Sequence, residues 1–416
     1  MSSLSDYGLH VEQAHERLKE VIKHTPLQLN HNLSSCHNAK IFLKREDLQV
    51  VRSYKLRGAY NMISLLANDE QQRGVVCASA GNHAQGFAYS CERRGIHGVV
   101  FMPQVTPRQK IQQTMRFGKN WINIRLTGDT YDDCAEAAIS YARKHQMTFI
   151  PPFDDRRIIE GQGTVGVELL NDLNHIDYIF IPIGGGGLCA GVGAYFKERS
   201  PQTTIIGVEP LGAPAMKAAF EAGQPVTLDQ IDRFVDGAAV KRVGELTSRI
   251  CRSVVDNICL VPEGKICSTI LKLYNEDAIV AEPAGALSIA ALDQYSSVIH
   301  GKNVVCIVSG SNNDIDRMQE IKERSLLYER LKHYFLIRFA QRPGALKDFV
   351  NKVLGPDDDI VRFEYMKKTN KDDGPALVGI ELNSAHDYEM LLHRLNENHF
   401  DFTTLAENDN LFTYIV

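Results

Sequence analysis

Short apolar runs alternate with longer amphipathic stretches along most of the chain, a pattern that predicts strands and helices in turn. The first amphipathic stretch, residues 9–23, predicts a helix that ends before Pro26, because the residue ahead of a proline disfavours the helical conformation. A strand is predicted at residues 41–43. Further strands are predicted at residues 75–78, 99–102, 122–126 and 148–150, with helices at 82–94, 107–117 and 130–145 between them. This βαβ rhythm predicts a mostly parallel sheet covered by helices on both faces.

The same rhythm restarts in a second segment and predicts a second sheet. Its strands are predicted at residues 178–183, 204–208, 257–261 and 304–308, and its helices at 158–173, 187–199, 264–277, 284–295 and 314–330. Two α/β units with a cleft between them are the usual setting for a small-molecule site. We therefore expect a catalytic domain over residues 1–330, with the smaller α/β unit at about 50–150.

The rhythm changes after residue 330. Strands are predicted at residues 334–339, 360–366, 376–382 and 411–416, and helices at 344–353 and 387–398. The order βαββαβ is that of a ferredoxin-like unit, which we place at residues 333–416. The fold class is therefore α/β with two open parallel sheets, followed by a C-terminal α+β domain.

Composition narrows the class of protein further. The 416-residue chain is 44% hydrophobic and 23% charged, which is ordinary for a globular protein. A net charge of −5 without a basic block argues against a nucleic-acid partner, and no apolar run is long enough for a membrane helix. The N-terminus lacks the pattern of a signal peptide, and nine cysteines without a C-x-x-C pair indicate reduced thiols. We therefore expect a cytoplasmic protein. Cys251, Cys259 and Cys267 are evenly spaced but have no histidine nearby, so no zinc site is expected.

Two of the three motifs with candidate chemistry surround a lysine and an asparagine. The first, SYKLRG at residues 53–58, places Lys55 just ahead of a predicted helix, where most lysines are solvated. A cation at Arg57 would disfavour the ammonium form of Lys55 if it lay close by. The second, SAGNHAQG at residues 79–86, follows a strand and opens a helix, so its small residues and its helix-start N–H groups favour an anion. A serine N-cap with a glycine-rich turn explains this second motif equally well.

The third motif, GGGGL at residues 184–188, lies between a predicted strand and a predicted helix. Residues without Cβ let consecutive N–H groups converge on a phosphate at a helix N-terminus. The segment also fits a permissive dinucleotide fingerprint through Gly185, Gly187 and Ala190, and Glu209 ends the next strand about 22 residues later. An NAD-dependent dehydrogenase is therefore a competing hypothesis, although it leaves the other two motifs unexplained.

Together and in this order, the three motifs resemble the cofactor lysine, the asparagine loop and the phosphate loop of fold-type II (tryptophan synthase β-like) enzymes that use pyridoxal 5'-phosphate. The chain is most similar to the threonine dehydratases, over about residues 20–320. The resemblance implies that Lys55 binds the cofactor covalently and, once released, removes the substrate α-proton. It assigns Asn82 to the phenolic oxygen of the cofactor and Ser309 to its pyridine nitrogen, where a neutral hydroxyl favours elimination over transamination. Glu282 is expected to line the same cleft, or simply to be a carboxylate favoured by a helix N-terminus.

The resemblance also implies two sets of site residues. Those that bind the cofactor are Lys55, Asn82, Gly184, Gly185, Gly186, Gly187, Leu188 and Ser309. Those that receive the substrate carboxylate are Ser79, Ala80, Gly81, Asn82 and His83. His83 fits a structural role at a helix start better than a catalytic one.

Two departures separate the chain from serine racemases of this fold. Those enzymes carry a second serine at the position of Ala80, so racemisation is expected to be poor. They also bind a divalent cation through two acids, of which one matches Glu209 and the other is replaced by Ala215. We therefore expect no metal site.

The C-terminal unit carries a second resemblance. With RPGAL at residues 342–346, in its first turn, it looks like the ACT-like regulatory domain of biosynthetic threonine dehydratases, and a single copy resembles their short form. ACT-like units of this kind bind amino acids at this turn. In a threonine-consuming enzyme that commits carbon to isoleucine, the implied ligand is L-isoleucine, acting as a feedback inhibitor. A purely structural dimerisation unit is the alternative.

The function implied is the dehydration and deamination of L-threonine to 2-oxobutanoate and ammonia, with L-serine as a secondary substrate and a homotetramer as the assembly. A serine or threonine dehydratase of the catabolic type is the alternative within the class. A non-catalytic amino-acid-sensing protein is the alternative outside it, but an intact Lys55 argues against that hypothesis.

Overall fold

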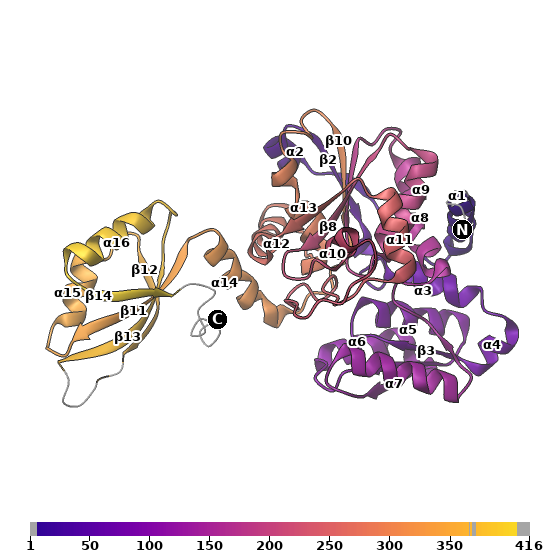
Figure 1. Ribbon diagram of the computed structural model, residues 1–416, viewed down its shortest axis with the longest axis horizontal. Helices are drawn as coiled ribbons and strands as arrows, with labels where there is room; N and C mark the ends of the chain where they lie inside the picture. Colours follow the sequence, from indigo (N-terminus) through magenta and orange to yellow (C-terminus); the bar gives the residue numbers. More distant parts are fainter. Residues whose placement is uncertain (1–5, 366, 368–371, 406–416) are drawn as a thin grey trace. The chain divides into compact units, whose positions relative to one another are not determined.

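The computed structural model describes residues 6–365, 367 and 372–405, and the chain divides into two compact units (Figure 1). Unit 1 comprises Met1–Glu263 and Leu273–Asn313. Unit 2 comprises Gly264–Lys272 and Asp314–Val416. Unit 1 contains two parallel-stranded sheets and unit 2 a single antiparallel one, as the sequence predicts.

The larger sheet of unit 1 has the strand order β1-β2-β10-β7-β8-β9. Its strands are β1 (Leu27–Leu29), β2 (Lys40–Arg45), β7 (Tyr178–Pro182), β8 (Thr204–Pro210), β9 (Asn257–Val261) and β10 (Asn303–Val308). All neighbours are parallel except β1, which runs antiparallel to β2. The strand that precedes Lys55 in sequence therefore belongs to the larger sheet, beside the last strand of unit 1.

The smaller sheet has the order β5-β4-β3-β6 and is entirely parallel. Its strands are β3 (Val75–Ala78), β4 (Gly98–Met102), β5 (Ile122–Leu126) and β6 (Thr148–Phe149). Every residue of β3 and β4 is buried, because helices cover both faces of the sheet.

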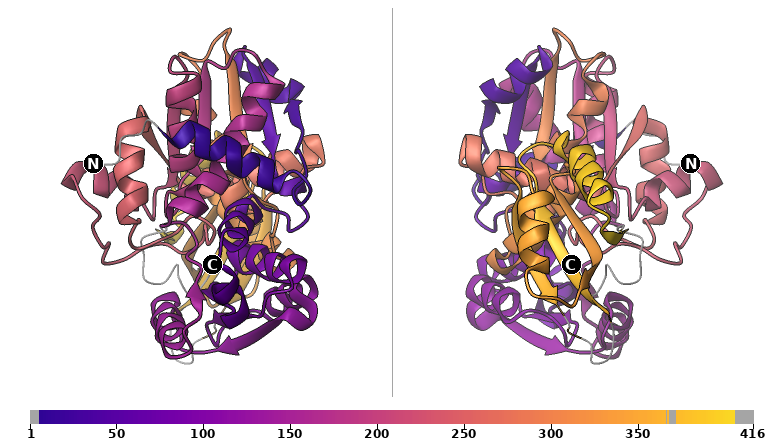
Figure 2. Two further views of the ribbon diagram at one scale, coloured as in Figure 1. Left: turned by 90° about the vertical axis from the view of Figure 1, so that its right-hand side faces the viewer. Right: turned by 90° about the vertical axis from the view of Figure 1, so that its left-hand side faces the viewer.

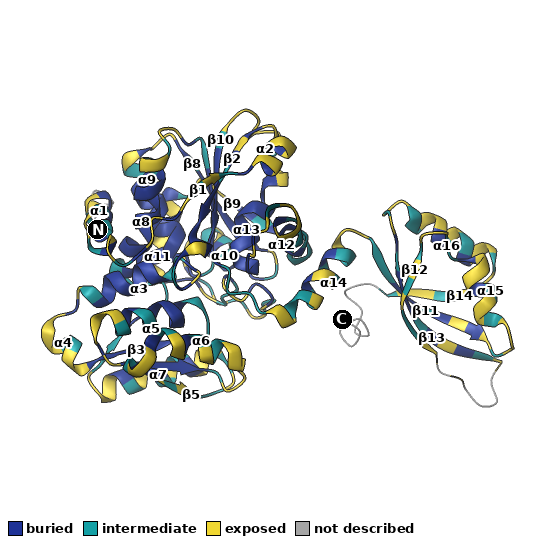
Figure 3. Ribbon diagram, turned by 180° about the vertical axis from the view of Figure 1, so that it is seen from behind, coloured by how far each residue is buried: buried dark blue, intermediate teal, exposed yellow. Residues whose placement is uncertain are grey.

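Helices of unit 1 follow the predicted rhythm, with four short additions that the hydrophobic pattern does not predict. The helices close to their predicted positions are α1 (Tyr7–Leu18), α3 (Lys55–Ser64), α5 (Asn82–Arg94), α6 (Arg108–Gly118), α7 (Tyr131–Lys144), α8 (Arg156–Asp172), α9 (Gly187–Arg199) and α13 (Pro283–Ala290). Helix α12 (Glu263–Asp277) also lies at its predicted position, but its residues Gly264–Lys272 belong to unit 2. The additions are α2 (His31–His37), α4 (Asn68–Arg73), α10 (Ala215–Ala222) and α11 (Glu245–Val254). Helix α1 packs against α8 and α9 (Figure 2). Helix α8 is buried without interruption from Ile158 to Leu169 (Figure 3).

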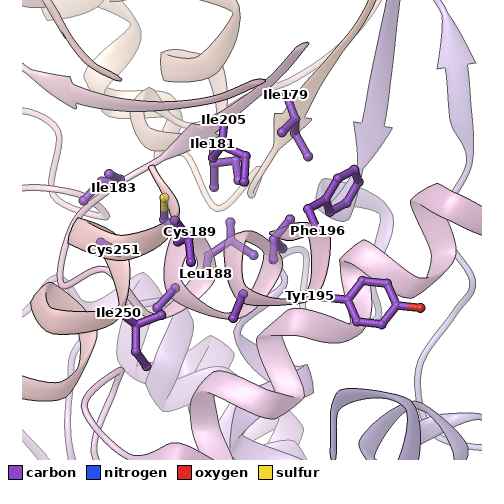
Figure 4. Close-up of a cluster of buried hydrophobic side chains, with 14 of the residues drawn as sticks. Ile179, Ile181, Ile183, Leu188, Cys189, Tyr195, Phe196, Ile205, Ile250 and Cys251 are labelled. Carbon is purple, nitrogen blue, oxygen red and sulfur yellow. The ribbon is translucent and has the colours of Figure 1, made fainter. Parts of the chain in front are cut away.

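The principal core of unit 1 lies between the larger sheet and the helices α9 and α11. Figure 4 shows the isoleucines of β7 and β8 facing the first residues of α9, among them Leu188 and Cys189. Ile250 and Cys251 of α11 close the cluster from the other side. The start of α9, directly after the glycine run, is thus fixed by hydrophobic packing.

Unit 2 contains α14 (Met318–Tyr328), followed by the predicted ferredoxin-like fold. Its elements are β11 (Lys332–Ala340), α15 (Ala345–Lys352), β12 (Asp359–Tyr365), β13 (Asp373–Glu381), α16 (Asp387–Glu397) and β14 (Asp401–Leu405), in the sheet order β12-β13-β11-β14. Helices α15 and α16 cover one face of this sheet (Figures 1 and 2).

The last strand of unit 2 differs from the prediction. The predicted strand at residues 411–416 lies outside the described residues, and β14 supplies the fourth strand earlier in the chain. Its register pairs Phe402 with Ile337, which brings the Phe402 ring against Phe335 in the core of unit 2. The hydrophobic pattern does not predict β14, because its two apolar residues, Phe402 and Leu405, do not follow the period-two alternation of a strand.

The sheet of unit 2 also forms a hollow of about 300 Å³. Its lining residues are Leu336, Ile337, Arg338, Asp373, Pro375, Asp401 and Thr403.

Among the described residues, no helix has the length and apolar character that crossing a membrane requires.

Candidate active site

Lys55 is the first residue of α3, and its side chain is partly buried. Its Nζ donates a hydrogen bond to the carbonyl oxygen of Pro152 at 3.0 Å. Burial lowers the pKa of Lys55 to about 8, against an opposing effect of the Glu282 carboxyl. The amine is therefore much more readily available in its neutral, nucleophilic form than that of a solvated lysine.

Arg57 does not act on Lys55 as expected. Its guanidinium is fully buried and bonds to Glu46 at 2.7 Å and to Glu168 at 2.8 Å. Burial by itself would lower the pKa of Arg57, but these two carboxylates raise it. The lowered pKa of Lys55 thus comes from burial and not from Arg57, because two carboxylates neutralise the guanidinium and positions two apart do not share a helix face.

The asparagine loop connects β3 to α5. The first hydrogen bond of α5 runs from Gln85 N to Gly81 O at 3.2 Å, so the N–H groups of the three residues between them lie in the uncapped first turn of the helix. A Cβ built on Gly81 meets no atom within 4 Å, so the loop borders open space. A helix start that borders open space is suited to an anion such as a carboxylate.

Asn82 is held by two residues from distant parts of unit 1. Its Nδ2 donates to Glu282 Oε1 at 2.6 Å, and its Oδ1 accepts from Asn312 Nδ2 at 2.6 Å. The Asn312 backbone N–H also donates to Glu282 Oε2 at 3.1 Å. Burial and the charge of Asp236 raise the pKa of Glu282 to about 7, although the hydrogen bonds from Asn82 and Asn312 oppose this rise. The cluster orients one amide and contains a carboxyl that titrates near neutral pH.

His83 lies in the first turn of α5 and is buried. Its Nε2 donates to the Ile150 carbonyl at 3.0 Å, which links α5 to the end of β6. Burial and the nearby Lys55 lower the pKa of His83 to about 3, so the ring stays neutral. This geometry agrees with a structural role at the helix start.

The glycine run forms a tight turn between β7 and α9. Gly186 has φ +94°, a conformation that favours glycine, and a Cβ on Gly185 would lie 2.2 Å from the Phe153 ring. The first hydrogen bond of α9 runs from Ala190 N to Gly186 O at 2.8 Å. The N–H groups of Gly187 and Leu188 therefore belong to the uncapped first turn of α9.

Ser309 follows β10 and is buried. Its hydroxyl donates to the Ala284 carbonyl at 3.0 Å, and its own carbonyl accepts from the Tyr54 N–H at 3.2 Å. The second bond ties the end of β10 to the residue ahead of Lys55.

Glu209 caps the start of a helix. Its two carboxylate oxygens accept from Met216 N at 2.7 Å and Lys217 N at 2.8 Å, which caps the start of α10. Burial raises the pKa of Glu209 to about 7, although these hydrogen bonds oppose the rise. Because both oxygens are engaged, Glu209 is not available to bind a ribose, as the dinucleotide hypothesis requires.

In the described part of the chain, no group of three or more His, Cys, Asp or Glu side chains is arranged for a metal.

Eight of the nine cysteines are buried, and Cys36 is exposed. Cys251, Cys259 and Cys267 are among the buried ones.

Sequence reasoning did not identify Asn312, Thr247 or the segment Pro152-Phe153-Asp154 as parts of the site. In this segment, the Pro152 carbonyl accepts a hydrogen bond from Lys55, the Phe153 ring packs against the glycine turn, and Asp154 caps α11. One signal could have found it: it directly follows a strand of a parallel sheet, and sites gather at such strand ends. No local pattern marks Thr247, because its partner is a distant backbone carbonyl.

These features fit a phosphorylated aldehyde cofactor. The glycine turn leaves no room for side chains and begins a helix, as a phosphate requires. Lys55 offers an amine with a lowered pKa, which an aldehyde requires. Lys55, Asn82, the glycine turn and Ser309 would hold such a group.

Comparisons with known proteins agree with this assignment. Residues 18–310 match the family described as Pyridoxal-phosphate dependent enzyme, and residues 323–415 match the C-terminal regulatory domain of Threonine dehydratase. The biosynthetic L-threonine dehydratase IlvA of Halalkalibacterium halodurans is 57% identical over 404 residues, 97% of either chain. That of Bacillus subtilis is 56% identical over 408 residues, 98% of this chain and 97% of its own.

The solved structure of the processed form of threonine deaminase isoform 2 from Solanum lycopersicum is also similar. It has 39% sequence identity and a TM-score of 0.74, over 77% of this chain and 93% of that chain. The chain therefore belongs to the pyridoxal-phosphate-dependent enzymes and, within them, to the biosynthetic L-threonine dehydratases.

Proposed function

We propose that this chain converts L-threonine into 2-oxobutanoate and ammonia, a step that leads to isoleucine, with L-serine as a secondary substrate. The observation that carries the proposal is the setting of Lys55. A partly buried amine with a pKa of about 8 lies in one site with the Asn82 cluster, and its Pro152 contact adjoins the glycine turn. Near-full-length identity to biosynthetic L-threonine dehydratases supports the substrate.

Each part of the site has a separate task in this proposal. Pyridoxal 5'-phosphate, when bound, supplies an electron sink that stabilises negative charge at the substrate α-carbon. Lys55 holds the cofactor and, once released, removes the α-proton with its neutral amine. The N–H groups at the start of α5 hold the substrate carboxylate, and those at the start of α9 hold the phosphate.

Asn82 is a donor that the protein orients in advance. Glu282 accepts one Nδ2 hydrogen and Asn312 donates to Oδ1, so the second Nδ2 hydrogen remains for a ligand oxygen. We assign that hydrogen to the phenolic oxygen of the cofactor. Ser309 is assigned to the pyridine nitrogen, and Ser79, Ala80, Gly81 and His83 to the loop around the substrate carboxylate.

A keto-acid assay with L-threonine and L-serine tests the proposal. The full-length protein should form 2-oxobutanoate from threonine and, more slowly, pyruvate from serine, and it should carry the visible absorbance of a bound cofactor. The matched variants are Lys55→Ala, which should lose both signals, and Lys19→Ala at an exposed position of the N-terminal region, which should lose neither. Cofactor absorbance without turnover of either amino acid would favour the amino-acid-sensing alternative and contradict the proposal.

We also propose that the ferredoxin-like domain of unit 2, predicted at residues 333–416, regulates the catalytic domain (residues 1–330) by binding L-isoleucine. The match to a regulatory domain of threonine dehydratase supports an amino-acid effector. The expected place is the turn after β11, where Arg342, Pro343 and Gly344 are exposed and Arg342 bonds to Asp348 at 2.5 Å. A typical coupling of roughly 1 to 3 kcal/mol predicts a fall in threonine affinity of about 5- to 150-fold at saturating isoleucine.

The hollow in the sheet of unit 2 offers a second place for the effector. It combines apolar Leu336 and Pro375 with Arg338, whose guanidinium lies 3.3 Å from Asp401 and 3.7 Å from Asp373. Arg342→Ala should remove isoleucine inhibition if the turn binds it, and Leu336→Ala should do so if the hollow does. If the unaltered enzyme ignores millimolar isoleucine, unit 2 is a structural dimerisation unit and the regulatory proposal is wrong.

A homotetramer and a cytoplasmic location complete the proposal. Nine cysteines without a C-x-x-C pair, eight of them buried, support a reducing compartment. Light scattering of the full-length protein tests the tetramer, and a dimeric mass at micromolar concentration would contradict it.

A further inference from the structure

The orientation of one peptide in the glycine turn is controlled from outside the turn. Thr247, the third residue of α11, is fully buried, and its hydroxyl donates to the Gly185 carbonyl at 2.6 Å. A trans peptide is planar, so its C=O and N–H groups point in opposite directions. The hydroxyl that holds the Gly185 carbonyl therefore turns the Gly186 N–H away from α11.

This control matters because the turn itself does not select an orientation. The peptide lies between two glycines, and Gly186 already has φ +94°. Glycine adopts positive and negative φ with similar ease, so a flip of this peptide has little intrinsic steric cost. A specific partner on one side of the peptide is what distinguishes the two orientations.

Thr247 is itself held in place by Asp154, from the loop after β6. The Asp154 carboxylate accepts from the N–H groups of Glu245 at 3.0 Å, Leu246 at 2.9 Å and Thr247 at 3.0 Å. These are first-turn N–H groups of α11, which have no partner within the helix. An acid at this position is favoured by hydrogen bonding and by the helix dipole.

The other side of the turn is closed by the neighbour of Asp154. A Cβ on Gly187 would lie 3.1 Å from Phe153, and one on Gly186 would lie 3.0 Å from Thr247 Cβ. The turn is thus enclosed between Phe153 and Thr247. The carbonyl of the preceding residue, Pro152, accepts a hydrogen bond from the Lys55 amine. The segment of residues 152–154 therefore contacts the lysine, the glycine turn and Thr247.

We propose that Thr247, held by Asp154, is a positioning residue for phosphate binding: its hydroxyl fixes the Gly185 carbonyl so that the Gly186 N–H stays available to the phosphate group of the cofactor. This inference rests on the proposed role of the glycine turn. It assigns to Thr247 no contact with substrate or cofactor.

The test compares two ligands that differ only in the phosphate. Cofactor-free, full-length protein is titrated with pyridoxal 5'-phosphate and with pyridoxal. The readout is the affinity for pyridoxal 5'-phosphate divided by the affinity for pyridoxal. Thr247→Val removes the hydroxyl at nearly constant shape, whereas Thr247→Ser retains it. The Val variant should lose roughly tenfold in affinity for pyridoxal 5'-phosphate, equivalent to about 1.4 kcal/mol, while its affinity for pyridoxal stays within about twofold. The Ser variant should keep the ratio of the unaltered protein.

Two neighbouring aspartates give a matched pair of controls. Asp154→Ala should lower the ratio as Thr247→Val does, because the start of α11 loses its cap. Asp155→Asn should leave the ratio unchanged, because Asp155 instead caps α8 through Arg157 N at 2.8 Å. Since each ratio is measured within one variant, partial unfolding lowers the signal amplitude without imitating the effect.

The remaining outcomes separate the inference from the function on which it rests. An equal loss for both ligands in Thr247→Val, or no loss for either, would overturn the positioning role while leaving the phosphate site intact. Equal affinities of the unaltered protein for the two ligands would overturn the phosphate site itself and the inference with it.

Discussion

A fully buried cluster of charges beside the site gives a quantitative prediction for Glu168→Gln. Glu168 bonds to Arg57 at 2.8 Å and to Lys44 at 2.7 Å, and all three side chains are at most 1% exposed. Glu46 is the other carboxylate on Arg57. The substitution keeps the shape of the side chain but leaves the two cations with one fully buried counter-charge, since Asp172 lies at 3.4 Å from Lys44 and is partly exposed.

The size of the effect follows from the pKa of Glu168. Burial alone would raise this pKa, but the charges and hydrogen bonds of Arg57 and Lys44 outweigh burial and lower the value from 4.5 to about 2. A tenfold change in proton affinity is worth about 1.4 kcal/mol, so the ionised carboxylate contributes about 3 kcal/mol to folding. Removing one partner of a buried pair costs roughly 3 to 5 kcal/mol in other proteins, which agrees with this value.

The sign of the pH dependence follows from the same pKa. Because the folded-state pKa is depressed, the stabilisation is complete above the unfolded pKa of about 4.5 and is lost as the pH falls towards about 2. Glu168→Gln has no such group. The difference in unfolding free energy between the two proteins should therefore be about 3 kcal/mol near pH 7 and should shrink as the pH falls below about 4.5.

Urea unfolding followed by fluorescence measures this difference. The chain has one tryptophan, Trp121, which lies in unit 1, so the signal reports the unit that contains the cluster. Glu160→Gln on the same helix is the control, because its partner Arg156 is 41% exposed and its charge stays solvated when the carboxylate is removed. If Glu168→Gln costs no more than Glu160→Gln, or if the difference stays constant down to about pH 3, the reasoning about the buried charges is wrong.

Four further outcomes follow from the site. Lys55→Ala should lower threonine turnover by several orders of magnitude, and normal turnover would exclude the assigned role. The rate at which the cofactor-free protein attaches pyridoxal 5'-phosphate should rise through about pH 8, since burial lowers the pKa of Lys55 to about 8; an inflection near 10.5 would contradict this. Gly185→Ala should abolish retention of the cofactor on dialysis, because its methyl group would lie 2.2 Å from the Phe153 ring, and full retention would show that the ring moves aside. Ala80→Ser should yield detectable D-serine from L-serine by chiral chromatography, whereas D-serine from the unaltered protein would contradict the expected absence of racemisation.

Local sequence was sufficient for the elements with strong periodicity and for the motifs. Strands β3, β4 and β5 and helices α5 and α9 lie within one residue of their predicted limits. Strands β3 and β4 are buried throughout, and strands buried on both faces appear in a sequence as continuous apolar runs. The motifs around Lys55, Asn82 and the glycine run are contiguous, so their order along the chain was enough to indicate the family. The identity of the cofactor followed from that order.

Only the tertiary structure decided which residues support these motifs. Helix α11 begins where Asp154 caps it, and this cap comes from the loop after β6, far away in the sequence, so no local pattern predicts the helix. Helix α10 begins where Glu209, at the end of β8, caps it. The two carboxylates on Arg57 likewise come from a turn and a helix far apart in sequence. The periodicity of apolar residues in a sequence indicates which face of an element is buried. Which buried or capping side chains come into contact depends on the order of the strands in the sheets. For this reason the sequence indicated the chemistry of Lys55, and the folded chain determined the environment that lowers its pKa.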